Sequence, residues 1–533
     1  MTYVAEEFTP AETEVLRRYF TNLDRPVFAL VNLPEVVKGA LFARYSRSHK
    51  SLRRLFLDEF VGELDVDGDV TLDAATGLTR AEELYERVFV EYGDDSVAQL
   101  GGVHLACEQA SNVLTKVLER GRLMSYLEQS TRYIAYDARL GGRYRYHRDP
   151  AILASRLGTR YVGDMDRMFD AYSEALELVT EHVRRVIPRS ASDSDFVHRQ
   201  ATRAKALDAV RGMLPAAATS NVGIYGSGQG FEMLLLRMRS HPLPEARTYA
   251  EEMLIELRKV IPSFLRRVDV PERGGMWSDY LADIDAQTEE LVDSLLGSTP
   301  VDAAPEVDLV DWDPAGEQRM IAAICYPHSS MSERQLTDAV SSMTDEQRSA
   351  ILAAAVGERQ NRRHKPGRGF ERIDYRFDVL SDYGAFRDLQ RHRLLTIDWQ
   401  RLSPNHGYVR PELVDEAGAG ALFDETMERS AELFDVLRPD FAEQAAYAVA
   451  MAHRIRYSMQ FNAREAIHLI ELRSSPQGHP SYRRVVLEMH RLIAEKAGHR
   501  AVANSMVHLT TEAPDLERLD SERRAEARRL PSG

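Results

Sequence analysis

One stretch of the sequence combines arginine, serine and glutamate in an arrangement that could bind a phosphorylated ligand. Residues 120–133 read Arg-Gly-Arg-Leu-Met-Ser-Tyr-Leu-Glu-Gln-Ser-Thr-Arg-Tyr. Alternate residues of an extended loop point to the same side, so Ser130 and Arg132 could hold a phosphate together. Glu128 could then accept a hydrogen bond from a sugar or a base. A solvated loop held by salt bridges fits the same residues, because short motifs also arise by chance.

The predicted secondary structure places these residues where a helix ends and a loop begins. Apolar residues recur three or four positions apart over most of the chain. This spacing predicts helices over 81–90, 96–121, 423–437, 444–458 and 485–496. Residues 65–72, rich in aspartate and glycine, are predicted to form a turn.

A break in composition divides the chain into two parts. Residues 301–314 contain prolines, five acidic side chains and no basic one, which is typical of a linker. We therefore predict a first module over 1–295, an acidic, proline-containing linker over 296–317 and a second module over 318–511. Residues 512–533 are dense in charge and are predicted to form a charged C-terminal tail that consists of a solvated helix with a frayed end.

The two modules repeat the same pair of elements in the same order. Residues 117–125 (Val-Leu-Glu-Arg-Gly-Arg-Leu-Met-Ser) correspond to 388–396 (Asp-Leu-Gln-Arg-His-Arg-Leu-Leu-Thr). Downstream, residues 231–239 correspond to 464–473, and each of these segments ends in arginine. A single Arg-x-Arg carries little weight, but the paired order indicates a tandem duplication.

Composition excludes several classes of function. The 533 residues carry 68 basic and 83 acidic side chains, a net charge of −15, whereas nucleic acid binding usually rests on basic patches. Cys107 and Cys325 lack the spacing of metal or redox motifs. No apolar run reaches the roughly 18 residues of a membrane helix. We expect a cytoplasmic protein with no metal site that binds neither nucleic acid nor membrane.

Residues 95–134 resemble the flavin-dependent thymidylate synthases, whose signature is Arg-His-Arg-x-x-Ser-x-x-x-x-Ser-x-Arg. Farther along, Arg211-Gly-Met-Leu-Pro215 looks like the Arg-x-x-Leu-Pro element of that family. Arg239 matches an arginine that contacts the uracil ring after a shift of one residue, and Arg237 competes for that role. The second half is similar to the same family through Arg391-His392-Arg393 and through the Asn-Ala-Arg…Leu-Arg element over 462–473.

The resemblance implies roles for individual residues. Catalytic roles pass to Ser130, Arg239 and Arg473. Substrate-binding roles pass to Glu128, Gln129, Ser130, Arg132, Arg211 and Arg120. Cofactor-binding roles pass to Arg391, His392, Arg393, Asn462, Arg464, His468 and Arg122.

Each half departs from the family pattern, largely at different elements. In the first half, Gly121 stands where the family has histidine, and 227–230 (Ser-Gly-Gln-Gly) replace Asn-Ala-Arg. In the second half, 401–403 (Arg-Leu-Ser) replace Ser-x-Arg, and Ala446 replaces a phosphate-binding arginine. Complementary losses favour composite sites to which each module contributes part. Erosion of both halves is the alternative.

The resemblance also implies a fold and a reaction. The fold is α+β and predominantly helical, with two homologous modules that each contain a small antiparallel sheet. The reaction is methylation of dUMP to dTMP with methylenetetrahydrofolate and reduced FAD, regenerated by NADPH. Family members are tetramers, so a homodimer of two-module chains is expected. The competing hypothesis is a non-catalytic flavin- or nucleotide-binding protein or scaffold derived from that fold.

Overall fold

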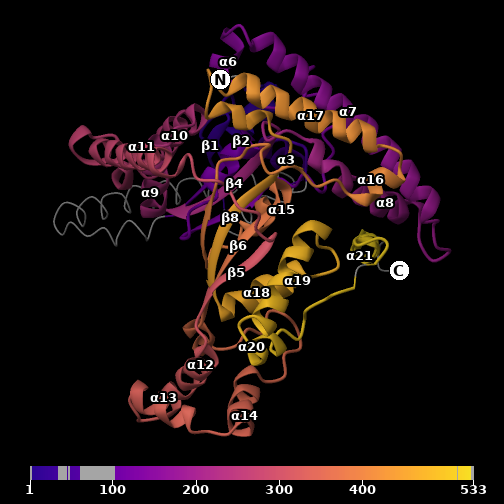
Figure 1. Ribbon diagram of the computed structural model, residues 1–533. Helices are drawn as coiled ribbons and strands as arrows, with labels where there is room; N and C mark the ends of the chain where they lie inside the picture. The colour runs from indigo at the N-terminus through magenta and orange to yellow at the C-terminus, as the bar shows by residue number, and fades with distance from the viewer. Residues whose placement is uncertain (1–2, 34–44, 46–47, 60–101, 513, 530–533) are drawn as a thin grey trace. The chain divides into compact units, whose positions relative to one another are not determined.

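The computed structural model describes residues 3–33, 45, 48–59, 102–512 and 514–529 (Figure 1). The predicted helix over 81–90 and the predicted turn over 65–72 lie outside these residues. The described residues form two compact units, and each unit is built from three separate segments of the sequence. Unit 1 consists of 1–173, 214–301 and 428–449, and unit 2 of 174–213, 302–427 and 450–533. Residues 174–213, expected in the first module, thus fold with unit 2, and 428–449 fold with unit 1.

Each unit is built on one antiparallel sheet of four strands. The sheet of unit 1 has the order β1 (Val27–Ala29), β2 (Gly102–Ser111), β4 (Thr219–Ser227), β3 (Met124–Glu128). The sheet of unit 2 has the order β5 (Val307–Trp312), β6 (Asp374–Asp382), β8 (Arg454–Asn462), β7 (Thr396–Trp399). The identical strand order confirms the α+β class with two similar small sheets.

Helices make up most of the remaining described chain. Those of unit 1 are α1 (Pro10–Leu16), α3 (Leu52–Glu59), α5 (Asn112–Leu118), α6 (Pro150–Ala154), α9 (Gly228–Arg239), α10 (Pro244–Leu257) and α11 (Met276–Leu296). Those of unit 2 are α8 (Asp195–Val210), α12 (Gly316–Cys325), α13 (Glu333–Ser341), α14 (Asp345–Val356), α15 (Tyr383–Leu389), α16 (Glu412–Glu416), α18 (Ala463–Arg473), α19 (Pro480–Glu495), α20 (Arg500–Asn504) and α21 (Leu519–Arg529). Two further helices, α7 (Gly158–Val186) and α17 (Gly420–Leu437), have residues in both units. Among the described residues, no helix combines the length and the apolar content needed to cross a membrane.

The two central strands of each sheet lead directly into helices through side-chain caps. Ser111 and Asp382 cap α5 and α15, and their side chains accept from the backbone N–H of Leu114 and Ala385. Ser227 and Asn462 cap α9 and α18 in the same way. Such caps satisfy backbone donors that the first turn of a helix leaves unpaired. They also give a common starting point from which the two units can be compared residue by residue.

The predicted helices over 423–437 and 485–496 are confirmed as parts of α17 and α19. The prediction over 96–121 was wrong for 102–111, which form β2. This central strand is buried along most of its length, and a short apolar run does not distinguish a buried strand from a buried helix. The prediction over 444–458 was also wrong, because a 3-10 turn over Gln444–Ala448 is followed by β8 from Arg454. Buried and more exposed residues alternate along β8, which is the pattern of a strand.

The segments predicted as linker and C-terminal tail each contain a regular element, a strand in the linker and the expected helix in the tail. The linker predicted over 296–317 contains β5, an edge strand of the unit 2 sheet. The tail predicted over 512–533 contains α21, whose neighbour Arg518 donates to both carboxylate oxygens of Asp208 at 2.8 and 2.9 Å. Strand β5 and helix α21 are therefore integral to unit 2.

The two sheets differ at one position in their central strands. The pairing of β2 with β4 shifts register between Cys107 and Ala110, whereas that of β6 with β8 runs without a break. Gln109 lies in the shifted stretch and has a φ of 58°. Strand β2 therefore carries a β-bulge. The bulge accompanies the burial of Glu108, which accepts a hydrogen bond from the Tyr45 hydroxyl at 3.0 Å.

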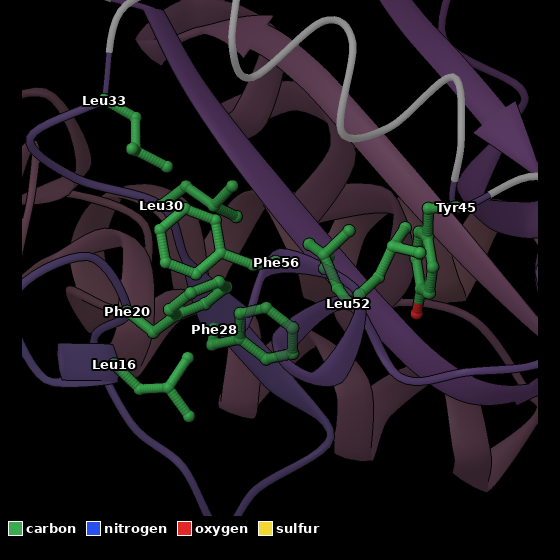
Figure 2. Packing of buried hydrophobic residues seen from close by; sticks show 10 residues of the cluster. Leu16, Phe20, Phe28, Leu30, Leu33, Tyr45, Leu52 and Phe56 are labelled. Carbon is green, nitrogen blue, oxygen red and sulfur yellow. The ribbon is translucent and has the colours of Figure 1, made fainter. Parts of the chain in front are cut away.

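A cluster of aromatic and aliphatic side chains forms part of the core of unit 1 (Figure 2). Phe20 packs edge-on against Phe28 and Phe56, with ring centroids 5.6 and 5.4 Å apart. The guanidinium of Arg53 lies 3.7 Å from the centre of the Phe28 ring. Phe28 is fully buried, so strand β1 is anchored mainly by apolar contacts.

The substitution Phe28→Ala should lower the free energy of unfolding of unit 1 by about 3–5 kcal/mol, the range for large-to-small changes in a packed core. Urea unfolding followed by fluorescence measures the loss. Leu123→Ala is the matched control, because Leu123 is 81% exposed and its removal leaves no cavity. Equal effects of the two substitutions would contradict the packing in Figure 2.

Candidate functional site

The candidate site lies in unit 2, where the ends of α15 and α18 meet. Helix α15 follows β6 and α18 follows β8, and the antiparallel pairing starts the two helices at opposite ends of these strands. His392, just beyond the end of α15, thereby reaches Glu465 in the first turn of α18 and Arg473 at its last residue. We call Arg211, Asp388, Arg391, His392, Glu465, His468 and Arg473 the unit 2 cluster.

His392 sits at the centre of a chain of two hydrogen bonds. The Nε of Arg473 donates to Nε2 of His392 at 3.0 Å. On the other side of the ring, Nδ1 lies 2.8 Å from Oε1 of Glu465. An arginine can only donate, so Nε2 must be the acceptor and the proton of the neutral ring lies on Nδ1. His392 therefore donates to the Glu465 carboxylate, and both of its nitrogens are engaged.

Burial shifts the pKa values of Glu465 and His392. It raises the pKa of Glu465 to about 7, although Lys365 and Arg464 act in the opposite direction. Burial also holds the pKa of His392 well below its usual range, and the nearby Arg473 adds to that effect. Near neutral pH the imidazole is uncharged, while Glu465 exchanges between its two forms.

A second group of contacts gathers three arginines around one aspartate. Arg211 Nη1 lies 3.2 Å from Oδ2 of Asp388, while Arg473 and Arg391 place Nη1 3.8 and 3.9 Å from Oδ1. Asp388 is 8% exposed and Arg211 is 3% exposed. A Cβ on Gly384 would lie 3.2 Å from Nη2 of Arg211, so glycine permits the close approach of this side chain. Three guanidinium groups gathered around one carboxylate form the kind of arginine cluster that suits an anionic ligand.

The remaining residues of unit 2 predicted to bind the cofactor are Arg393, Asn462, Arg464 and His468. Burial lowers the pKa of His468 to about 4, helped by the positive charges of Lys365 and Arg362. Its ring packs edge-on against His392 with centroids 5.5 Å apart. Asn462 uses its side chain to cap α18, and Arg464 donates from Nε to the carbonyl of Pro366 at 2.8 Å. Arg393 is exposed.

By spacing alone, three residues of the cluster form a group of metal-binding type. The ligand atoms of His392, Glu465 and His468 lie within 4.8 Å of one another. The hydrogen bond from Arg473 nevertheless leaves a proton on Nδ1 of His392, directed at the carboxylate oxygen where a cation would sit. The positive charges of Lys365 and Arg464, which act on Glu465, also disfavour the binding of a cation there. The arrangement favours a proton over a metal ion between His392 and Glu465.

The corresponding place in unit 1 is closed by its own side chains. Counted from the helix caps, Gly121 corresponds to His392. A Cβ at Gly121 would lie 2.5 Å from the hydroxyl oxygen of Tyr126 and 3.5 Å from Nη2 of Arg237. Burial lowers the pKa of Arg237, and Arg120 lowers it further. Arg237 is therefore the arginine adjacent to Gly121, while Arg239 pairs with Glu251.

The other predicted residues of unit 1 lie within β3 or close to either end of it. Glu128 is buried, with its carboxylate 3.3 Å from the ammonium of Lys116. Gln129 is buried and its backbone N–H donates to the carbonyl of Asn221 at 2.9 Å. Ser130 accepts through Oγ from the backbone N–H of Arg132 at 3.2 Å, which forms a tight turn. Arg120 and Arg122 are exposed. The ligand-binding roles of these residues stay predictions.

Sequence reasoning missed Asp388 and Glu465. Asp388 was quoted as the start of a repeated helix end but was given no role. Glu465 follows Asn462 by three residues, the position of a glutamate that merely completes a helix cap. Signals for both were present, since Asp388 precedes an arginine by one helical turn and Glu465 precedes His468 by the same spacing.

Comparisons with known proteins identify one family. The family model described as thymidylate synthase complementing protein matches residues 43–263 and 308–498. A UPF0159 protein of Chlamydia pneumoniae is 40% identical over 496 residues, which cover 92% of this chain and 93% of the relative. A UPF0159 protein of Chlamydia muridarum is 38% identical over 98% of this chain and 99% of its own. Among solved structures, the UMP/dUMP methylase PolB from Streptomyces cacaoi bound with 5-Br dUMP matches at 19% identity with a TM-score of 0.29. This match covers 37% of this chain and 94% of the methylase.

The substitution Gly121→Ala should destabilise unit 1 by about 1–3 kcal/mol, because the new methyl group overlaps the Tyr126 hydroxyl. The same substitution in a Tyr126→Phe background should cost clearly less, since the overlapping oxygen is gone. Urea unfolding of the four proteins of this double-mutant cycle measures the coupling. Purely additive effects would contradict the closure of this position by Tyr126.

A second expectation concerns pH. The folded protein holds the Glu465 proton with a pKa of about 7, against an ordinary value of 4.5. The stability that this proton provides is fully present below pH 4.5 and is lost as the pH rises through 7, by about 3 kcal/mol in total. Relative to Glu465→Gln, the wild type should therefore lose stability between pH 5 and 8. Melting temperatures of both proteins across this range measure the difference, and a constant difference would contradict the raised pKa.

Proposed function

The chain belongs to the family of thymidylate synthase complementing proteins, and from this membership we propose that it methylates dUMP at C5 to form dTMP, with FAD as its cofactor. The observation that carries the proposal is the unit 2 cluster, in which Arg211, Arg391 and Arg473 share the single carboxylate of Asp388. An anionic nucleotide would balance this charge. The cluster also contains His392, a neutral histidine whose two ring nitrogens are both hydrogen-bonded.

The residues present fit a flavin with a diphosphate. The positive charges of Lys365 and Arg464 lower the pKa of both His468 and Glu465, and Arg362 lowers that of His468. We propose that Arg391, His392, Arg393, Asn462, Arg464 and His468 hold the cofactor. When bound, FAD supplies the redox chemistry of the methylation, with methylenetetrahydrofolate as carbon donor and NADPH as reductant.

The protein's own residues would bind and orient the nucleotide. Arg211 is buried with its guanidinium against Asp388, so little side-chain freedom is lost when it binds a phosphate. Arg473 donates from Nε to His392 and holds Nη1 3.8 Å from Asp388, and we propose that the guanidinium fixed in this way faces the uracil ring. A fixed donor of this kind stabilises negative charge that develops on the ring, an effect worth a few kcal/mol in comparable sites.

One observation favours a second candidate, a non-catalytic flavin- or nucleotide-binding protein. In unit 1 the histidine position is Gly121, closed by Tyr126, and Glu128 is engaged with Lys116. If the unit 2 cluster also lacks turnover, the chain retains binding without chemistry. The two candidates differ in dTMP formation and agree in ligand binding.

The test is a dTMP-formation assay with dUMP, methylenetetrahydrofolate, NADPH and FAD, combined with flavin spectra. The wild type should bind FAD and form dTMP, whereas binding without product would select the second candidate. Absence of both flavin binding and product would overturn the proposal. Sedimentation of the same sample tests the proposed homodimer.

The substitution Arg211→Ala should weaken dUMP binding at least tenfold, since a hydrogen bond to a charged group contributes about 1.5–3 kcal/mol. Titration calorimetry measures the Kd. Arg491→Ala is the matched control, because Arg491 lies in unit 2, is half exposed and pairs with Glu488 and Glu495 of its own helix. Equal dUMP affinities of the two variants would remove Arg211 from the site.

A further inference from the structure

Glu465 lies in the unit 2 cluster without a role in the proposed reaction. We propose that Glu465 is a positioning residue that fixes the protonation of His392 and, through it, the guanidinium of Arg473. The inference rests on the proposed function for its effect on turnover. Its geometric part stands independently.

The first support is the rigidity of Glu465 itself. Its backbone N–H donates to the side chain of the capping residue Asn462 at 2.9 Å, which holds the first turn of α18. The residue is 4% exposed, and Oε1 accepts from Nδ1 of His392 at 2.8 Å. A carboxylate placed in this way presents an acceptor at a fixed point and cannot donate while it is ionised.

The second support is the chemistry of the neutral imidazole, which carries one proton shared between two possible nitrogens. With an acceptor at Nδ1, the proton stays there and Nε2 remains free to accept from Arg473. Without that acceptor, the ring can place its proton on Nε2, where it would face the N–H of Arg473. Two donors then oppose each other, and Arg473 loses the contact that orients it.

The third support comes from the other half of the chain. Counted from the helix caps, His392, Glu465 and Arg473 correspond to Gly121, Gly230 and Met238 of unit 1. His392 and Glu465 are both replaced by glycine there, whereas an arginine, Arg237, still lies beside Gly121. The histidine and the carboxylate are thus lost together, as expected of two residues that act as one hydrogen-bonded pair.

Charged groups around the chain explain why the acceptor is a carboxylate. Lys365 and Arg464 face Glu465, and Lys365, Arg362, Arg464 and Arg473 face His468. Asp388 lies on the far side of Arg473, at 3.8 Å from Nη1. A negative group beside His392 offsets part of this positive charge and favours the donor role of Nδ1.

The direct test is ¹⁵N nuclear magnetic resonance of the full chain labelled at histidine, recorded at pH 8. His392→Asn identifies the His392 signals by their loss. The wild type and Glu465→Gln should both carry the ring proton on Nδ1, because the glutamine oxygen accepts as well. Glu465→Met, which keeps the volume without the acceptor, should move the proton to Nε2. A wild-type proton on Nε2 overturns the inference even if the methionine variant fails to fold.

Steady-state kinetics measures the consequence for Arg473. With dUMP, kcat should fall about 10- to 100-fold in Glu465→Met, the range for a misplaced catalytic group, and stay within about threefold in Glu465→Gln. Glu488→Gln, at an exposed ion pair in α19, is the control. An equal loss in the glutamine and methionine variants would overturn the positioning role.

Two further outcomes are decisive. If Zn²⁺ added to the wild type shifts the His392 and His468 signals together and Glu465→Gln abolishes that shift, the cluster is a metal site and the inference is wrong. If the wild type forms no dTMP but the proton still moves from Nδ1 to Nε2 in Glu465→Met, the proposed function fails while the positioning geometry stands.

Discussion

The unit 2 cluster depends on the hydrogen bond that Arg473 donates to His392. Because an arginine cannot accept, this contact requires that Nε2 of the imidazole carry no proton, so the ring proton lies on Nδ1 and faces Glu465. The same contact holds the guanidinium of Arg473 in a fixed orientation. The surrounding structure places these three side chains. Capped helices start at the ends of β6 and β8, and the residues just after α15 contact side chains from the first turn and the last residue of α18.

The two units share one arrangement of strands and helix caps but differ in the side chains that follow the caps. Strand order and helix caps coincide, but unit 1 carries a bulge in β2 and closes the histidine position with Tyr126. Duplication allows one copy to relax its polar site while the other keeps it. The exchange of segments adds a second link between the halves, since Arg211 comes from the first half of the sequence and folds within unit 2 beside Asp388.

Sequence reasoning identified the family, the duplication and most of the charged residues of the unit 2 cluster. Motif spacing carries that information, because residues such as Arg391 and Arg473 are fixed by their distance from helix caps. Sequence reasoning failed for β2 and β8, because their apolar runs are compatible with either a helix or a strand. Pairing with a neighbouring strand determines which of the two forms. Sequence reasoning also failed for Glu465, because a glutamate in a capping position has an ordinary local explanation. The contact with His392 joins residues far apart in the sequence, which local pattern does not encode.

The central claim is that the unit 2 cluster binds a nucleotide beside a flavin. The most direct measurement is the visible spectrum of the FAD-loaded protein during titration with dUMP, for the wild type and for Arg473→Ala. A saturable change in the flavin bands of the wild type, absent or shifted to much higher dUMP concentrations in the variant, is the predicted result. An identical change in both proteins would show that the nucleotide binds without Arg473 and would contradict the account.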